Sequence, residues 1–493
     1  MDFFDWLAQP FGGSQVGALF AYLCVLSIFL LLGKILRVKI KLFQSILLPA
    51  SVIGGFIGLI CGPFILGALT GSEGFIKVLE SMRVGFGSLP GRLIDVIFAT
   101  MFLGIMIPKG KDIIKNSGPM LSYSMIVGGP MQHVIAGLLA LLVLIPLFGV
   151  DSTFSTILEI GFAGGHGTAG GMVDTFRNGI PEVGWSFPAG ADLGFTSATI
   201  GILTSTIVGI ALINLAARKG YTKVLEKPQD LPEEIRVGII PPEKRYSISK
   251  ATVASESIEP LAFHLAIIFI AVLIGYLLDA LLARLGILLR GMTGNIYISA
   301  ALDAIPTFPL CMLGGMILQI LFTKLGISSL IDKQSVDRLQ GIALEFLIVS
   351  AIASISIPVV LEYAAPFFLL MAVGIIYIVL VTWFIAPRML SGSWFEKSIV
   401  EFGMETGVTA MGIMLLRVVD PRFETEASES FAFKQLIYEP FFGGGFITAL
   451  SPIFIVVWGL SSWIILMAAL VILAGIILPL AAKWFHKRAE PYR

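Results

Sequence analysis

Long apolar runs constrain this chain more than any other feature of its sequence. The first two, Gly17 to Gly33 and Ser45 to Thr70, contain no charged side chain. A helix needs about 20 mostly apolar residues to cross the hydrocarbon core of a bilayer. The pattern therefore predicts an all-α polytopic membrane protein with about eleven spanning helices. The nine further runs are Leu93–Pro108, Met120–Val150, Leu193–Ala217, Leu261–Ala283, Ile296–Phe322, Gly341–Val360, Phe367–Ala386, Phe441–Trp458 and Trp463–Ala482.

Composition excludes a soluble protein of this length. Hydrophobic residues make up 56% of the 493 residues and charged residues 13%, whereas an ordinary soluble domain has about 25% charged residues. Lys+Arg and Asp+Glu both number 33, so the net charge is zero and no basic surface suggests a nucleic-acid partner. The three cysteines lie in apolar runs and form no Cys-x-x-Cys pair, which excludes a disulfide framework and a zinc site. The expected partner of the surface is the lipid bilayer.

Basic residues predict the orientation of the chain. Lys34 and Arg37 directly follow the first apolar run, and the positive-inside rule places such residues in the cytoplasm. The N-terminus is then outside. The long polar stretch Arg218 to Glu259 follows five predicted crossings and is rich in Lys and Arg, so we expect a cytoplasmic linker there. The tail that begins at Lys483 is also basic, which predicts a cytoplasmic C-terminus.

The sequence contains an internal repeat. Leu48 to Gly55 aligns with Phe308 to Gly315: in each, an apolar residue and a proline precede four small or apolar residues and a Gly-Gly pair. Glu159–Phe162 and Glu401–Met404 form a second aligned pair. Each repeat unit has five predicted crossings, an odd number, so two units in series have opposite orientations. Inverted repeats with broken helices are typical of secondary transporters.

These boundaries predict the domain organisation. We expect two inverted five-helix repeats, each with a re-entrant hairpin, plus one extra C-terminal helix. The predicted ranges are 1–217 for the first repeat, 218–259 for the linker, 260–458 for the second repeat and 459–493 for the additional helix and tail.

One segment in each half is apolar but too rich in glycine for a stable spanning helix. These segments lie at about residues 155–180 and 395–416. We interpret them as re-entrant hairpins that enter from outside and from the cytoplasm, with tips that can meet near the midplane. Irregular backbone is tolerated at that depth only where it is buried in protein or lines a wet cavity. Alternatively, the glycines serve only tight helix packing.

Hairpin tips of this kind suit an anionic ligand, because half-helix N-termini present backbone N–H groups and a positive dipole end. Gly165 to Gly170 also matches G-x-G-x-x-G, but no strand or βαβ unit accompanies it, so a dinucleotide site is not indicated. The predicted substrate-binding residues are Gly164, Gly165, His166, Gly167, Thr168, Thr406, Gly407 and Thr409.

Ionisable residues within apolar runs are functional candidates, because the bilayer makes them costly. Asp192 opens the fifth run, where its carboxylate is either a helix N-cap or a ligand of Na⁺, a cation that prefers hard oxygens. Glu405 lies inside the second hairpin, where a buried anion requires a cation or a proton. The predicted cation-binding residues are Asp192, Thr196, Thr199, Glu401 and Glu405, with Asp192 and Glu405 as the leading Na⁺ ligands. Four other groups are expected to be packing or interfacial residues: Asp95, His133, His264 and Asp279.

The motif Gly164-Gly165-His166-Gly167-Thr168 resembles the first hairpin of the bacterial sodium/glutamate symporter family. The second hairpin is similar to that family's Gly-Phe-Gly-Leu-Gly-Ala-Thr-Pro-Thr-Ala signature through Phe402–Met404 and Thr409–Ala410. The resemblance implies Na⁺-coupled uptake of glutamate or a similar anion by an elevator-like homodimer. The chain departs from the family pattern in Glu401 and Glu405, in Val408 instead of the signature proline, and in a final helix.

The sequence therefore predicts a sodium:glutamate-type symporter of a bacterial inner membrane, with Na⁺ as coupling ion and no other cofactor. The expected partners are a small anionic substrate, Na⁺, lipid and a second copy of the chain. Three alternatives are a carrier of another small carboxylate, a channel, and an intramembrane enzyme that uses His166 with Glu405 or Glu159. The enzyme lacks support, because no nucleophile or metal-ligand spacing such as H-E-x-x-H occurs.

Overall fold

The computed structural model describes residues 15–105, 110–225 and 233–489. The chain is 80% helical, and these ranges contain no strand. The predicted all-α class is therefore confirmed. Both ends of the chain, the end of the third apolar run near Pro108 and the middle of the linker lie outside the described residues.

Nine helices in the described ranges are long and apolar enough to cross a membrane. The chain is therefore an integral membrane protein with several spanning helices. The nine are Val16–Lys39, Ala50–Thr70, Ser117–Phe148, Ala189–Arg218, Pro260–Thr293, Thr307–Lys324, Ala364–Met389, Trp394–Val419 and Leu460–Leu480.

Two predicted runs fail to form a long apolar helix for different reasons. Within Leu93–Pro108, helix α7 (Pro90–Ala99) ends early and turns follow it. Most of the run Gly341–Val360 belongs to α19 (Lys333–Ala353), which ends at Ala353 and whose first turns are charged. These differences explain why the number of long apolar helices in the described residues is below the eleven predicted.

Two other segments also differ from the prediction in length. The run that ends at Trp458 gives only a shorter apolar helix, α25 (Phe446–Trp458). In contrast, the second interrupted segment belongs to a long element, α23 (Trp394–Val419), which is one of the nine.

The chain is divided into two compact units, and each unit takes segments from both sequence halves. The first consists of Met1–Ile105, His166–Thr196 and Glu233–Glu362. The second consists of Met106–Gly165, Ser197–Pro232 and Tyr363–Arg493. The boundary passes through the first interrupted segment, between Gly165 and His166.

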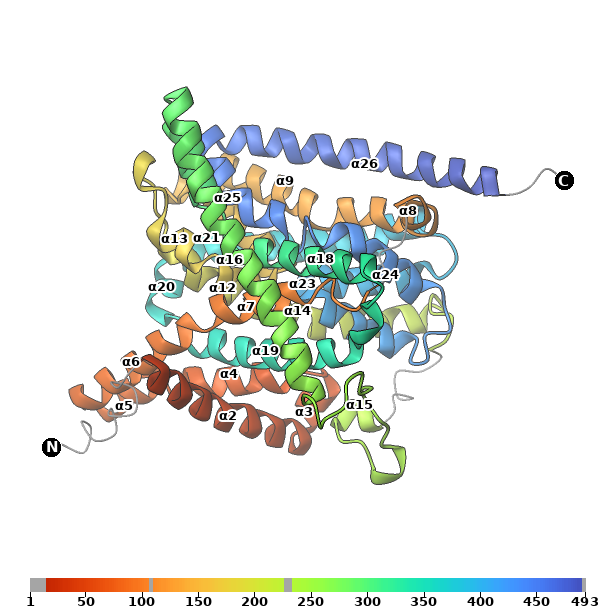
Figure 1. Ribbon diagram of the computed structural model, residues 1–493, viewed down its shortest axis with the longest axis horizontal. Coiled ribbons are helices and arrows are strands. Elements are labelled where there is room, and N and C mark those ends of the chain that lie inside the picture. Colours follow the sequence, from red (N-terminus) through yellow and green to blue (C-terminus); the bar gives the residue numbers. More distant parts are fainter. Residues whose placement is uncertain (1–14, 106–109, 226–232, 490–493) are drawn as a thin grey trace. The chain divides into compact units, whose positions relative to one another are not determined.

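The first unit contains the N-terminal helices and most of the first part of the second half. In Figure 1, α2 and α4 lie side by side, as their contacts require. Its helices are α2 (Gln15–Lys39), α3 (Lys41–Ser45), α4 (Ala50–Ile60), α5 (Ala68–Thr70), α6 (Glu73–Ser88), α7, α12 (Gly165–Gly171, from His166), α13 (Val173–Asn178), α15 (Glu233–Val237), α16 (Pro260–Thr293), α17 (Ile296–Asp303), α18 (Thr307–Lys324), α19 and α20 (Ile357–Glu362).

The second unit contains the middle of the first half and the C-terminal helices. Helix α14 (Ala189–Arg218) begins in the first unit and continues in the second. The remaining helices of the second unit are α8 (Gly110–Val127), α9 (Gly129–Leu139), α10 (Ile145–Phe148), α11 (Ile157–Gly161), α21 (Ala364–Leu380), α22 (Ala386–Met389), α23, α24 (Ala427–Tyr438), α25 and α26 (Leu460–Ala489).

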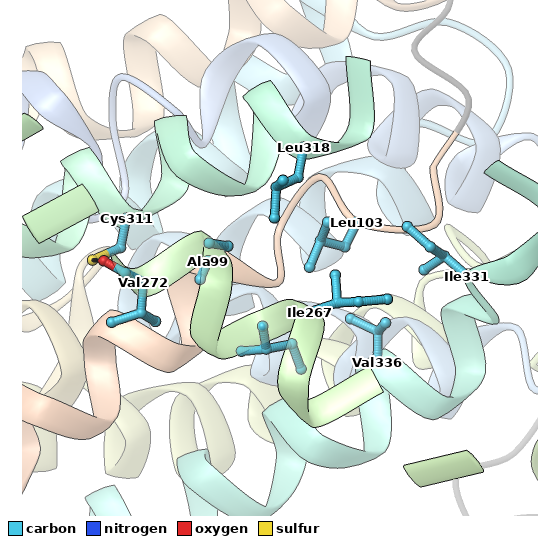
Figure 2. Packing of buried hydrophobic residues seen from close by; sticks show 10 residues of the cluster. Ala99, Leu103, Ile267, Val272, Cys311, Leu318, Ile331 and Val336 are labelled. Carbon is cyan, nitrogen blue, oxygen red and sulfur yellow. Dashed lines mark hydrogen bonds between the residues drawn. The ribbon is translucent and has the colours of Figure 1, made fainter. Parts of the chain in front are cut away.

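A buried apolar cluster joins α16 and α18 to α7 and α19 in the first unit. Figure 2 shows Ile267 and Val272 of α16 near Cys311 and Leu318 of α18. Helices α16 and α18 approach closely because glycines face each other's backbone: a Cβ added to Gly275 would lie 2.6 Å from the Cα of Cys311. Small residues at such contacts are typical of membrane helix packing.

The two Gly-Gly pairs of the aligned repeat make equivalent contacts. On α4, Gly54 faces Phe29 of α2, the first helix of its own half, whereas Gly55 faces α19 of the other half. On α18, Gly314 faces α16, the first helix of its own half, whereas Gly315 faces Ala99 of α7 in the other half. The aligned motifs thus perform the same packing role in both halves, as expected of a structural repeat.

Candidate functional site

The first interrupted segment contains a short break between two helices. Helix α11 ends at Gly161, and the N–H of Gly164 donates to the carbonyl oxygen of Glu159 at 3.0 Å. Gly165, which begins α12, has φ of +68°, a conformation that favours glycine. Gly164 and Gly165 are both buried. The predicted break in the first half is therefore present at these two residues.

The rest of the first motif lies in the first unit. His166 and Thr168 are buried, with 2% and 0% of their surface exposed. Thr168 Oγ1 has no hydrogen-bond partner among the described residues. A Cβ on Gly167 would meet the Ile94 side chain, so tight helix packing explains this glycine.

The second interrupted segment reverses direction. Within α23, Gly407 has φ −154° and ψ 36°, and Val408 has φ 63° and ψ 171°. A Cβ on Gly403 would lie 2.7 Å from the Cα of Gly412, whereas nine residues of continuous helix span about 13 Å. Residues on either side of the break therefore pack against each other as two arms. The segment is a helical hairpin with its tip at Gly407 and Val408.

The tips of the two segments are in contact within the second unit. A Cβ on Gly165 would overlap Cγ1 of Val408. Both residues have φ between 60° and 70°. At Val408 this φ, combined with ψ 171°, is a region that is essentially confined to glycine and costs about 1–3 kcal/mol for other residues. The contact at the tips is therefore made by strained or glycine-dependent backbone.

Helix α14 supports the second tip. Thr406 and Ser205 share a hydrogen bond of 2.6 Å between their hydroxyl oxygens, and Thr406 Oγ1 also donates to the carbonyl oxygen of Phe402 at 2.7 Å. A Cβ on Gly201 would meet the carbonyl oxygen of Thr406, and one on Gly407 would lie 2.5 Å from Ser205 Oγ. The predicted residues Thr406 and Gly407 are thus fixed by Ser205, which the sequence did not single out.

The two glutamates that depart from the family pattern have different protein partners. Glu401 Oε1 accepts a hydrogen bond of 2.7 Å from Lys434 Nζ, and both side chains are completely buried. Glu405 is also buried, and the Gln132 amide donates to its backbone oxygen at 3.0 Å and to Oε2 at 3.3 Å. The sequence suggested Na⁺ as the positive charge beside Glu401, whereas in the structure the Lys434 ammonium supplies that charge.

Thr409 opens the second arm and is tied to α24 and the residue after it. Its hydroxyl donates to Glu439 Oε1 at 3.0 Å and accepts from the Gln435 amide at 2.7 Å. Residues from Glu401 to Gly407 are buried, whereas Thr409 is half-buried and Ala410 is exposed. Near the tip, exposure is therefore confined to the N-terminus of the second arm.

Glu159, the residue aligned with Glu401, forms another buried polar group. Its Oε1 accepts from Thr448 Oγ1 at 2.7 Å and from the N–H of Gly443 at 3.2 Å. His133 Nε2 lies 3.5 Å from Glu159 Oε2, and its ring packs edge-to-face on Trp463. The contact with Trp463 agrees with the packing role expected for His133, and the approach to Glu159 is an additional polar contact.

The other predicted cation residues lie on α14. Asp192 Oδ1 accepts the N–H of Ser356 at 2.8 Å, just before α20, and Thr196 Oγ1 donates to the carbonyl oxygen of Asp192 at 2.7 Å. Asp192 and Thr196 belong to the first unit, and the buried Thr199 belongs to the second. The carboxylate thus accepts a hydrogen bond from the residue that precedes α20, whereas the sequence had offered it as an N-cap of its own helix or as a cation ligand.

An Asp192→Asn variant separates the hydrogen bond to Ser356 from a role as cation ligand. The asparagine amide oxygen can still accept the Ser356 N–H, so the thermal stability should stay close to that of the parent. If the charge ligates Na⁺, the Na⁺ concentration for half-maximal uptake should rise roughly tenfold, the equivalent of about 1.4 kcal/mol of lost binding energy. An unchanged Na⁺ activation curve in a stable variant would leave Asp192 as a structural hydrogen-bond acceptor alone.

Comparison with known families decides the assignment. The sequence profile of the sodium/glutamate symporter family matches residues 16–425, which is most of the chain. The chain belongs to the sodium/glutamate symporter family. Comparison with curated proteins and with solved structures gave no match.

The matched range of the chain contains both interrupted segments but ends before α24. The residues that sequence reasoning missed include Lys434 and Gln435 of α24, together with Gln132 and Ser205. A signal for Lys434 was present: Phe431 and Tyr438, three residues before and four after it, lie on the same helical face. Their ring centroids are 4.8 Å and 4.4 Å from Lys434 Nζ.

Proposed function

We propose that this symporter takes up glutamate, or a closely related anionic amino acid or dicarboxylate, together with Na⁺. Family membership supplies the class of activity. The observation that carries the proposal for the site is the contact between Gly165 and Val408, beside the accessible N-terminus of the second arm. Backbone N–H groups at such a helix start bind carboxylates and attract negative charge.

Within the second unit, the proposed substrate residues are those that form or adjoin the two tips. A substrate carboxylate binds the N–H groups that follow Val408. Thr409 remains a candidate predicted from the sequence, because its hydroxyl already donates to Glu439. Gly165 lacks a Cβ, which lets the Val408 side chain approach it, and Gly164 remains a candidate predicted from the sequence. His166, Gly167 and Thr168, which belong to the first unit, remain substrate candidates predicted from the sequence alone, and Asp192, Thr196, Thr199 and Glu405 remain candidates for Na⁺.

The mechanism that we propose is alternating access of the elevator type in a homodimer. Division of the chain into two compact units, each built from both halves, supports a rigid-body movement of one unit. Coupling requires that Na⁺ and substrate each raise the affinity for the other, and this linkage is reciprocal. We also propose the orientation derived from the basic residues, in a bacterial inner membrane, with the N-terminus outside and the C-terminus in the cytoplasm.

Uptake into proteoliposomes tests this function directly. With an inward Na⁺ gradient, vesicles that contain the protein should accumulate labelled glutamate, and replacement of Na⁺ by choline on both sides should abolish the accumulation. Protein-free vesicles are the control. If neither glutamate nor any competing dicarboxylate is accumulated under a Na⁺ gradient, the proposal fails.

A second candidate is a carrier of a different small carboxylate. It is favoured by Glu401 and Glu405, which place two carboxylates in an arm where the family signature has small residues. Competition in the same vesicles distinguishes the two substrates: an unlabelled hydroxycarboxylate would then suppress uptake more strongly than unlabelled glutamate.

A further inference from the structure

Helix α24 lies beyond the family match, yet it supplies a charged side chain to the interior of the second unit. Lys434 is completely buried. A buried ammonium loses its hydration and is found only where other groups compensate for that loss. Helices α23 and α24 are in contact, and both are drawn in blue in Figure 1. The compensating groups come from these two helices.

Oxygen atoms and aromatic faces surround the ammonium. Nζ lies 2.7 Å from Glu401 Oε1 and 2.7 Å from Gln435 Oε1, and 3.7 Å from the sulfur of Met404. The rings of Phe431 and Tyr438 lie within 5 Å of Nζ, a distance at which aromatic faces attract a cation. This is a built cation site whose occupant is covalently attached to the chain.

The carboxylate keeps unused capacity for a cation. Glu401 Oε2 is buried and has no hydrogen-bond partner in the part of the chain that the structure describes. A carboxylate and an amide oxygen are hard donors of the kind that Na⁺ prefers. We propose that Lys434 is a tethered cation that occupies a Na⁺ site at Glu401, so that a free Na⁺ binds there only when the ammonium is removed.

The functional consequence rests on the proposed symport. No transported Na⁺ is then bound at Glu401, because the positive charge beside it is the Lys434 ammonium, which is part of the protein. The Na⁺ that drives uptake binds elsewhere. Glu401 departs from the family pattern, and Lys434 lies beyond the family match. The two residues depend on each other, because either alone would leave a buried charge without a partner.

Thermal unfolding of the purified protein in detergent tests this inference without a transport assay. The melting temperature is measured in equal concentrations of NaCl and choline chloride, and the Na⁺-induced rise is compared between variants. In Lys434→Met, this rise should exceed that of the parent by on the order of a few °C, because a ligand that binds only the folded state stabilises it. In Lys434→Arg, which keeps the charge, the rise should equal that of the parent.

Two further variants identify the ligand. Glu401→Gln/Lys434→Met removes both charges and should return the Na⁺-induced rise to the parental value. Lys397→Met is the matched control, because Lys397 pairs with Glu426 at 3.1 Å at a partly exposed position. It should leave the Na⁺-induced rise unchanged.

Each possible outcome either supports or overturns the proposed Na⁺ site at Glu401. Recovery of folded Lys434→Met only in NaCl supports the proposal as strongly as a larger shift does. An extra rise that persists in the double variant, a parental rise in Lys434→Met, or loss of the folded Lys434→Met protein in both salts would each overturn it. Uptake by the parent protein is not involved, so failure of the transport proposal is distinguished from failure of this one.

Discussion

Replacement of Gly403 by alanine should abolish transport and lower the stability of the second unit. The added methyl group would lie 2.7 Å from the Cα of Gly412 and 2.8 Å from its nitrogen. Backbone atoms cannot swing aside as a side chain can, so the two arms must separate. Overpacking of this kind costs about 1–3 kcal/mol, whereas helix propensity alone would give a gain of about 1 kcal/mol. Opposite signs make the experiment decisive.

Gly341→Ala is the matched control, because Gly341 lies in α19 with nothing within 4 Å of an added Cβ. We expect unchanged uptake and an equal or higher melting temperature for this variant. Labelled-glutamate uptake in proteoliposomes and thermal unfolding in detergent measure the two effects. Parental uptake and stability in Gly403→Ala would mean that the chain does not reverse at Gly407 and Val408.

Substitution of proline for Val408 should eliminate transport. Proline holds φ near −65°, whereas Val408 has φ 63°, so the tip cannot form with proline in this position. We expect a loss of stability of more than about 1 kcal/mol, because the native φ is incompatible with proline, and no measurable uptake. This result would show that the hairpin tip of this chain differs in backbone conformation from one that carries the signature proline of its family.

The counterpart is Val408→Gly, which should retain uptake. Glycine reaches the Val408 conformation without strain, so the folded state gains about 1–3 kcal/mol from the relief of backbone strain. This gain opposes the destabilisation that comes from the greater conformational freedom of glycine in the unfolded chain. The melting temperature should therefore be equal or higher. Both variants are compared by uptake and by thermal unfolding. A functional Val408→Pro variant, or an inactive Val408→Gly variant, would contradict the claim that transport requires a positive φ at residue 408.

The sequence alone determined the membrane class, because a helix that crosses a bilayer must be apolar over its whole length and such runs can be read directly. The family could be inferred from the motifs in the two interrupted segments. The positions of these segments could also be read from the sequence, since Gly165 and Gly407 disfavour a continuous helix locally. The aligned Gly-Gly pairs were visible for the same reason: small residues permit close helix contacts wherever they occur.

Other features depended on which elements meet in space. Among the described residues, the short α7 and the charged start of α19 leave fewer long apolar helices than the sequence has apolar runs. Glu401 pairs with Lys434, 33 residues further along the chain, and Glu405 with Gln132, 273 residues earlier. No local pattern encodes such partners. A buried carboxylate requires compensation wherever it lies, but only the packing of α23 against α24 selected a lysine for Glu401, whereas the sequence by itself offered Na⁺.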